Sequence, residues 1–362
     1  MANRFKYWLI LGGFGFLVVL GACTEIFDPE IDPQGEVLVV EGLVTDQWGP
    51  HWIKLSQALP YDGNFQDRPV SNARVFVADQ NGTEFYLYER EPGLYRSFPG
   101  LRAQEGYSYV LHIETEQGEY YQSTPQMLNP GPQVDSLESR FANILVEQQN
   151  AQGEIFFGNV PGLEFTAEID AENGASPLLR FEAMVLVQYV LYELGSADPA
   201  FMYCRRKMPL DNDVNIVVPD FDSSIGDVVR HKVAFMPQSF GVFHGDQEWG
   251  LLRLDRRIII LRQYALNQEA YIFYKGLREQ LSSDGMLFDP IPGQLIGNIK
   301  CLSDPGKQAL GLFEVSAAYT STFALIREPI NENRTQIWRI HDLDYLSEHD
   351  CSYEVVPYGW LY

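Results

Sequence analysis

Cys23 has the most specific chemical setting of any residue in this sequence. It follows Leu20, Gly21 and Ala22, which close an apolar run over residues 8–20. Gly21 and Ala22 are small enough for the pocket of a peptidase that cuts next to them, and a thiol is the nucleophile that acyl transfer needs. These residues predict that the chain is cut before Cys23 and that the Cys23 thiol receives lipid.

The segment before Cys23 has the layout of a secretory signal. Arg4 and Lys6 form a short basic region, and the apolar run follows it. A transmembrane anchor is the alternative, but residues 7–22 fall short of the roughly 20 that a spanning helix needs, and no basic cluster follows. The motif resembles a bacterial lipobox. We therefore interpret residues 1–22 as a lipoprotein signal peptide and expect acylated Cys23 to hold the mature chain on a lipid bilayer.

The rest of the sequence contains no recognisable catalytic motif. There is no H-E-x-x-H and no G-x-S-x-G. The pairs His341–Asp342 and His349–Asp350 are better explained as solvated turns than as metal ligands. With 49 Asp and Glu residues, some pair of carboxylates will be close by chance, so paired acids do not indicate a glycosidase. We predict no catalytic residue, no metal site and no cofactor; the weakest alternative is a surface hydrolase with an unrecognised site.

Two oxygen-rich stretches, Asp211–Asp213 and Asp220–Asp227, raise the question of a calcium site. Ile225 stands where an EF-hand loop needs glycine, and no glutamate follows at the twelfth position. An exposed polar loop is the preferred interpretation.

The composition limits the class of partner and the redox chemistry. Removing the signal also removes Arg4 and Lys6, which takes the formal net charge from −23 to −25 and argues against nucleic-acid binding. Besides Cys23 there are three cysteines, Cys204, Cys301 and Cys351. One disulfide is possible in an oxidising compartment, and all three pairings remain open.

Strand signals dominate the mature chain. Residues 23–35, which contain Pro29 and Pro33, read as an extended tether. Residues 36–128 contain about seven short alternating segments with regular turns, among them a hairpin turn at Asn81–Gly82. This pattern predicts an immunoglobulin-like or prealbumin-like β-sandwich.

A larger β-rich domain is predicted over residues 134–362, beyond the proline-rich boundary at 129–132. It contains one clear helix at about 267–283, in which Asn267 can cap the first turn. The apolar residues of this helix recur at helical spacing and should cover a sheet face: Ala270, Tyr274, Leu277 and Leu281. The predicted fold class is therefore mainly β.

Several short motifs after the lipobox together resemble the DUF4249 lipoproteins of Bacteroidota. In order, they are Val39-Val40-Glu41-Gly42, Ile53-Lys54-Leu55-Ser56, Asn72-Ala73-Arg74-Val75, Glu91-Pro92-Gly93-Leu94-Tyr95 and Gly106-Tyr107-Ser108-Tyr109-Val110-Leu111. The resemblance implies a non-enzymatic accessory subunit of a TonB-dependent, SusC-like outer-membrane transporter that aids nutrient capture or uptake. The alternative is a structural component of an outer-membrane assembly or secretion complex.

The acids after Cys23 resemble the export signals of surface lipoproteins in the same bacteria. They favour display on the cell surface over the periplasmic face of the outer membrane. Asp135-Ser136-Leu137 resembles the O-glycosylation tripeptide of these organisms, which makes Ser136 a candidate modification site; a turn leading into the next strand is the alternative.

Aromatic residues form two groups that could bind a peptide or a sugar. Trp48 and Trp52 flank Gly49-Pro50-His51, and Tyr358, Trp360 and Tyr362 crowd the end of the chain. Amphipathic rings are frequent at binding surfaces, but they are equally suited to a β-sandwich core, and core is the preferred interpretation.

Overall fold

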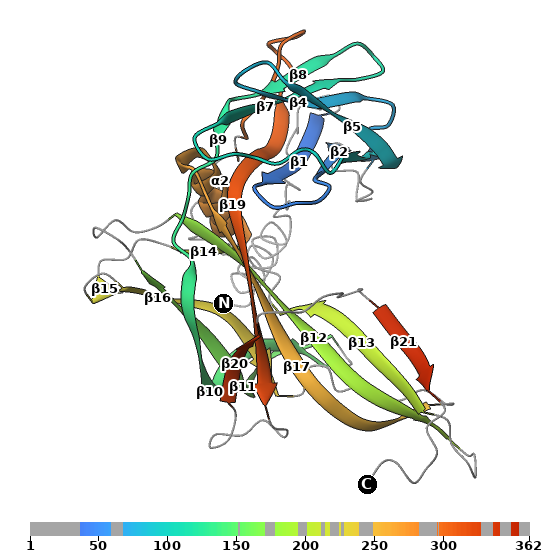
Figure 1. The fold of residues 1–362 in the computed structure, drawn as a ribbon, viewed down its shortest axis with the longest axis vertical. Coiled ribbons are helices and arrows are strands. Elements are labelled where there is room, and N and C mark those ends of the chain that lie inside the picture. Colours follow the sequence, from blue (N-terminus) through green and yellow to red (C-terminus); the bar gives the residue numbers. More distant parts are fainter. Residues whose placement is uncertain are drawn as a thin grey trace, which may run out of the picture.

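The computed structural model describes most of the mature chain, with gaps. The described residues are 37–58, 68–150, 153–170, 178–194, 201–210, 214–217, 224–225, 228–238, 249–281, 295, 297–326, 336–340 and 349–354. Within them the protein is mainly β with one helix, as the sequence predicts (Figure 1). No described helix is long and apolar enough to cross a membrane.

The upper region in Figure 1 is a rolled sheet built chiefly from the first part of the chain. Its strands are β1 (Val37–Thr45), β2 (Trp52–Ala58), β3 (Arg68–Pro69), β4 (Arg74–Asp79), β5 (Glu84–Glu91), β6 (Leu94–Ser97), β7 (Ser108–Glu114), β8 (Tyr120–Ser123), β9 (Gln126–Met127) and β18 (Ile299–Cys301). The hairpin between β4 and β5 turns at Asn81–Gly82 as predicted, with Gly82 at φ 82°, a value that glycine adopts without steric cost.

Alternation along these strands supplies the upper core. Val75 and Val77 on β4 face the same interior as Leu111 and Ile113 on β7, and all four side chains are buried. The residues between them point to the other face of the sheet, where the Phe76 and His112 rings stack at 4.6 Å. The sandwich-like arrangement predicted for residues 36–128 follows from this alternation.

The lower region consists of longer strands in two packed sheets. One is the lower part of a 17-stranded sheet that continues into the upper region through β19. It contains β12 (Leu179–Glu193), β13 (Phe201–Pro209), β14 (Asn215–Ile216), β17 (Trp249–Ala265), β19 (Ala309–Ile326), β20 (Gln336–Ile340) and β21 (His349–Glu354). The other contains β10 (Val134–Gln149), β11 (Ile155–Asp170), β15 (Ser224–Ile225) and β16 (Val228–Pro237). Residues such as Phe165 and Val185 are fully buried in one core cluster between them.

One strand, β19, belongs to both regions. Its first half runs parallel to β1, with Leu38 opposite Ala309 and Thr45 opposite Ser316. Its second half runs antiparallel to β17, with Ala265 opposite Ala317. Residues 299–316, which fall within the predicted 134–362 domain, therefore complete the upper sheet (Figure 1).

The helix α2 (Gln268–Leu281) lies at the junction of the two regions. Asn267 caps it as predicted, because its Oδ1 accepts the Ala270 N–H at 2.8 Å. Ala270 and Tyr271 are buried against the junction, which confirms that the helix covers a sheet face. The predicted apolar stripe does not hold to its end, since Leu281 is 61% exposed.

Candidate functional site

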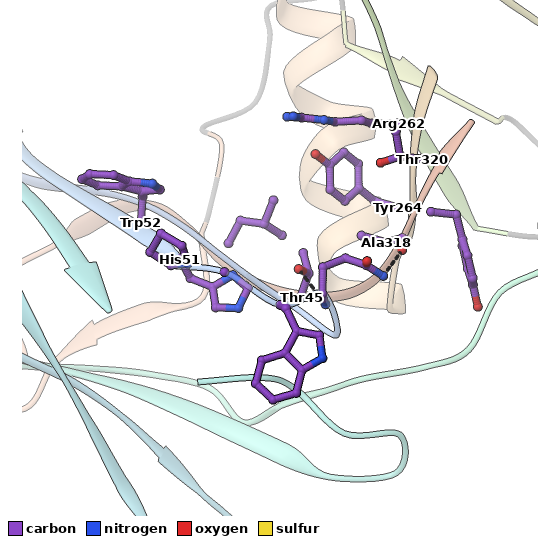
Figure 2. A pocket seen from close by; sticks show the side chains of 13 residues that line it. Thr45, His51, Trp52, Arg262, Tyr264, Ala318 and Thr320 are labelled. Carbon is purple, nitrogen blue, oxygen red and sulfur yellow. Dashed lines mark hydrogen bonds between the residues drawn. The ribbon is translucent and has the colours of Figure 1, made fainter. Parts of the chain in front are cut away.

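A cleft of about 420 Å³ opens beside the junction (Figure 2). One wall comes from the end of β1 and the loop that leads into β2, and the other from β17 and β19. The lining residues are Leu43, Thr45, Gln47, Trp48, Gly49, Pro50, His51, Trp52, Arg262, Tyr264, Ala318, Tyr319 and Thr320. The volume lies in the range of small-molecule sites.

Hydrogen bonds fix the loop of the first wall to β19. The Gln47 side-chain amide donates to the Ala318 carbonyl at 2.7 Å, and the Ala318 N–H donates to Asp46 Oδ1 at 2.9 Å. These two bonds join positions more than 270 residues apart in the chain. The wall that carries the tryptophans is therefore positioned before any ligand arrives, which lowers the entropic cost of binding.

His51 is a structural residue of this loop. Its backbone N–H donates to Ser97 Oγ at 2.9 Å, and its ring Nε2 lies 3.0 Å from the Leu101 carbonyl. Because a carbonyl can only accept, Nε2 carries the proton. Burial lowers the pKa of His51 below its ordinary value, so the ring is neutral at pH 7. His51 holds the loop in place and is not a free proton donor or acceptor on the cleft.

The two tryptophans are exposed, so the preferred interpretation of them as core residues is wrong. Trp48 is 76% exposed and Trp52 is 40% exposed. Trp48 lies in the loop, and Trp52 begins β2 on the face opposite to buried Ile53. The Arg102 guanidinium stacks over the Trp48 ring at 5.4 Å. Exposed tryptophans held in this way form a ready surface for stacking, because their burial on binding is favourable.

Arg262 supplies the charge of the second wall (Figure 2). In the register of the sheet it lies opposite Thr320 of β19 on one side and opposite Glu182 of β12 on the other. Its guanidinium forms no hydrogen bond or ion pair with any residue that the structure describes, although Glu182 is the nearest acid by register. The cleft thus combines indole rings with a cation that is available to an acceptor group.

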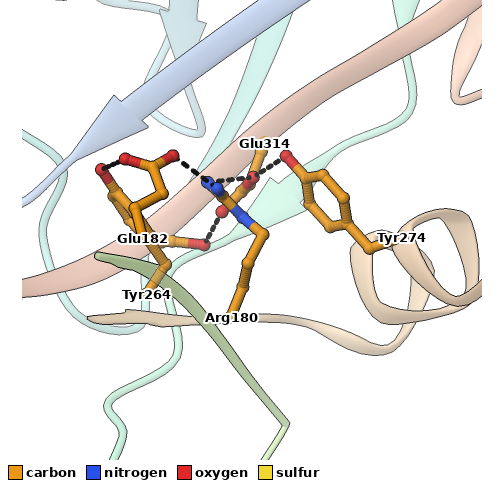
Figure 3. A network of polar contacts seen from close by, with 6 residues as sticks. Arg180, Glu182, Tyr264, Tyr274 and Glu314 are labelled. Carbon is orange, nitrogen blue, oxygen red and sulfur yellow. Dashed lines mark hydrogen bonds and ion pairs between the residues drawn. The ribbon is translucent and has the colours of Figure 1, made fainter. Parts of the chain in front are cut away.

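Behind the cleft, Arg180 links a buried polar network (Figure 3). Its guanidinium donates to Glu182 Oε1 at 2.6 Å and to Glu314 Oε2 at 3.4 Å. The same group stacks on the Tyr264 and Tyr274 rings, at 4.3 and 4.7 Å. This network joins β12, β17, α2 and β19 at one point.

Glu314 is the most deeply buried member of the network, with its side chain 1% exposed. Besides the Arg180 contact, it accepts the Tyr274 hydroxyl at 2.6 Å and the Ser316 hydroxyl at 2.6 Å. Burial lowers the pKa of Arg180, but the carboxylates of Glu314 and Glu182, together with the Tyr274 hydroxyl, outweigh it and raise that pKa above its ordinary value. The buried arginine is therefore charged and compensated.

Tyr264 connects the network to the cleft. Its ring lines the cleft, and its hydroxyl donates to Glu182 Oε2 at 3.1 Å. Burial, followed by the charge of Glu182, raises the pKa of Tyr264 to about 12. The hydroxyl stays protonated at neutral pH, so Tyr264 serves as a fixed donor that orients Glu182.

The arrangement is suited to binding a small molecule. The described lining presents rings, amides and one available cation, but no nucleophile paired with a base. Among the described residues no three His, Cys, Asp or Glu side chains gather into a metal-binding group. An aromatic ring or sugar that carries an acceptor group matches the rings and Arg262 together.

Of the residues singled out from the sequence, Trp48 and Trp52 line this cleft, and the others lie apart from it or outside the described residues. Ser136 is in β10, where its hydroxyl donates to Glu168 Oε2 at 2.8 Å in a half-buried position, and O-glycosylation there stays a prediction. Several others lie outside the described residues: Leu20, Gly21, Ala22 and Cys23, the 23–35 tether, most of the two acidic loops, His341–Asp342, and Tyr358, Trp360 and Tyr362. The backbones of His349 and Asp350 lie in β21.

Sequence reasoning missed Arg180, Arg262 and Glu314. A signal was present for two of them, since Arg180 stands between Leu179 and Phe181 and Glu314 stands in an equally apolar strand. A lone charge inside a run that should be buried must find a partner. Nothing in the sequence says which partner it finds.

Comparison with known protein families identifies the family of this chain. The sequence profile described as a domain of unknown function, DUF4249, matches residues 24–322, which is more than half of the chain. The chain belongs to the DUF4249 family. No curated protein and no solved structure matches it significantly. The DUF4249 match starts at Thr24, directly after Cys23, and ends at residue 322 within β19, so it includes both walls of the cleft.

Proposed function

We propose that this chain is a lipid-anchored outer-membrane protein that serves as a non-enzymatic accessory subunit of a TonB-dependent transporter, with the aromatic cleft as its capture site. The observation that carries the capture role is the pair of exposed tryptophans beside Arg262, held by a loop that β19 fixes in place. Support for the anchor comes from the lipobox and from the DUF4249 match that begins one residue after Cys23.

The direction of the strands fits a tethered body. Val37 begins β1, and β1 runs parallel to the first half of β19, whose second half enters the lower sheet. The tether therefore joins the upper region at the end remote from the long lower strands. Its 13 residues, from 23 to 35, would reach about 45 Å when extended. That length lets the cleft and the lower strands stand clear of the lipid and face a partner.

Anchoring and partnership are tested together in the native membrane. The tagged protein is extracted from outer membranes in mild detergent, and co-purifying proteins are identified by mass spectrometry. A stoichiometric TonB-dependent receptor is the expected result. Recovery with assembly or secretion machinery would favour the structural role instead, and recovery alone would refute an obligate partner. Labelling with radioactive palmitate should be lost in Cys23→Ser.

The capture role needs separate variants. Trp48→Ala and Trp52→Ala should each reduce receptor or ligand recovery about tenfold or more, because buried tryptophans dominate binding energy at interfaces. Phe98→Ala removes another exposed aromatic side chain, 64% exposed, that does not line the cleft and is the matched control. Equal recovery from all three variants would remove the cleft from the proposal.

A further inference from the structure

A second cavity, of about 550 Å³, lies in the lower region away from the aromatic cleft. Its walls come from the β10–β11 hairpin, the short strand β14, strand β16 and the last turn of α2. The two cavities share no lining residue. The second one therefore needs an explanation of its own.

Most of the cavity wall is apolar. Ile144, Val146 and Val160 contribute from the hairpin, and Phe235 and Leu210 contribute from the other side. The three hairpin residues are only half-buried, whereas Phe235 is 6% exposed and Leu210 is 9% exposed. Covering an apolar wall of this kind with a hydrocarbon group lowers the free energy, because apolar surface is removed from water.

The charged groups among the described lining residues of the cavity are both cationic. They are Lys232 and Arg278, and none of the described lining residues carries a carboxylate. This is unusual in a chain with 49 acidic and 26 basic residues. Glu164 lies just outside, where it pairs with Lys232 at 3.1 Å and with Arg140 at 2.7 Å. One carboxylate is thus shared between two cations, which leaves a positive excess at this edge.

Arg278 is the group most available to a ligand. Its side chain is half-buried in the last turn of α2, and it forms no hydrogen bond or ion pair with a residue that the structure describes. The helix dipole favours a cation there, but it does not satisfy the five guanidinium donors. An anionic oxygen in the cavity would do so.

The remaining polar groups of the cavity satisfy each other. His231 and Asn215 are 2.6 Å apart through Nε2 and Oδ1, and the Asn215 amide donates to the carbonyls of Lys232 and Val233. Burial is the main cause and the charge of Arg278 is the second cause that lower the pKa of His231 to about 4. The imidazole is therefore neutral at pH 7. Because His231 and Asn215 already have hydrogen-bond partners, a ligand does not need to supply polar groups to them.

We infer that this cavity binds a single-chain amphiphile with one anionic head, of the fatty-acid class, with the alkyl chain against Ile144, Val146 and Val160 and the carboxylate at Arg278 and Lys232. A sugar would leave the apolar wall without a matching surface, and a cationic amphiphile would meet Arg278. The inference does not depend on the proposed transporter role.

Saturated carboxylates from octanoate to tetradecanoate are the probes, titrated by calorimetry into the mature chain with Cys23→Ser so that its own acyl chains are absent. Each added methylene should tighten binding about fourfold until the cavity is full. Dodecanol and dodecyltrimethylammonium are the neutral and cationic comparisons. Dodecyl phosphate distinguishes a general anion site from a carboxylate site.

Two variants test the placement. Arg278→Gln should weaken dodecanoate about tenfold and leave dodecanol unchanged, while Lys275→Gln, an exposed cation on the same helix, should change neither. Val146→Trp should fill the cavity and weaken the binding of both dodecanoate and dodecanol. If the Val146→Trp variant does not fold, Val160→Phe is the second variant with the same expected effect. Equal binding of the cationic amphiphile, no dependence on chain length, or no effect of Arg278→Gln would each overturn the inference.

Discussion

Replacing Arg180 should be the most destabilising single change at the junction. Arg180→Met keeps a long apolar side chain between the Tyr264 and Tyr274 rings but removes the charge. Among the described residues, Glu314, 1% exposed, would then keep the Tyr274 and Ser316 hydroxyls as its partners. The variant tests whether charge compensation, and not packing, holds the two regions together.

The expected loss is about 3–5 kcal/mol in the free energy of unfolding, because removing one partner of a buried pair leaves an uncompensated buried charge. Arg140→Met is the matched control. Arg140 contacts Glu164 at 2.7 Å, closer than the 3.4 Å between Arg180 and Glu314, but its side chain is 78% exposed. The control should cost less than about 1 kcal/mol. Burial, and not distance, sets the difference.

A double-mutant cycle separates this coupling from other effects. Glu314→Gln in the Arg180→Met background removes the uncompensated charge. The double variant should therefore lose about 1–3 kcal/mol less free energy of unfolding than the two single variants lose in sum. Urea unfolding followed by tryptophan fluorescence and by circular dichroism gives the midpoints and shows whether the transition is two-state. Additive single effects, or an Arg180→Met cost as small as that of Arg140→Met, would refute the reasoning.

Three further outcomes follow from the described contacts. His231 has a pKa of about 4 when folded and about 6.5 when unfolded, so stability should fall by up to about 3 kcal/mol as pH decreases from 6.5 to 4; the urea midpoint should depend less on pH in His231→Gln. Cys204 is disulfide-bonded and lies opposite Cys351 in register, so non-reduced peptide mapping should join these two and find Cys301, a buried thiol, alkylated only after unfolding. Asn267→Ala should cost about 0.5–2 kcal/mol and Asn267→Gly only a few tenths, and equal losses in thermal scans would argue against the cap.

The parts of the fold that the sequence predicts well are local. Alternation in the first region, the Asn81–Gly82 turn and the Asn267 cap each depend on residues within a few positions of each other. The length of the longer strands is not local: β12 extends without interruption over Leu179–Glu193. Its neighbours β13 and β17 decide this, because periodicity identifies a strand but not its length in a sheet.

The candidate site was predictable only in part. The sequence indicates that Trp48 and Trp52 could bind a ligand, but their exposure depends on which strand packs beside the loop. The register of β17 and β19 places Arg262 on the same cleft, more than 200 residues later. No spacing in the sequence reports that distance in space.

Amino-acid order by itself determined the mainly β character, the family membership, the turns and the helix with its cap, because these follow from local conformational preference and from which face of a strand is apolar. Tertiary structure alone decided that β19 joins β1 and β17, and that Arg180 meets Glu314 across 134 positions. Alternation of apolar and polar residues indicates which face of a strand is buried, but it does not indicate which strand pairs with it. The partner is chosen by the burial of the whole core, to which every strand contributes at once.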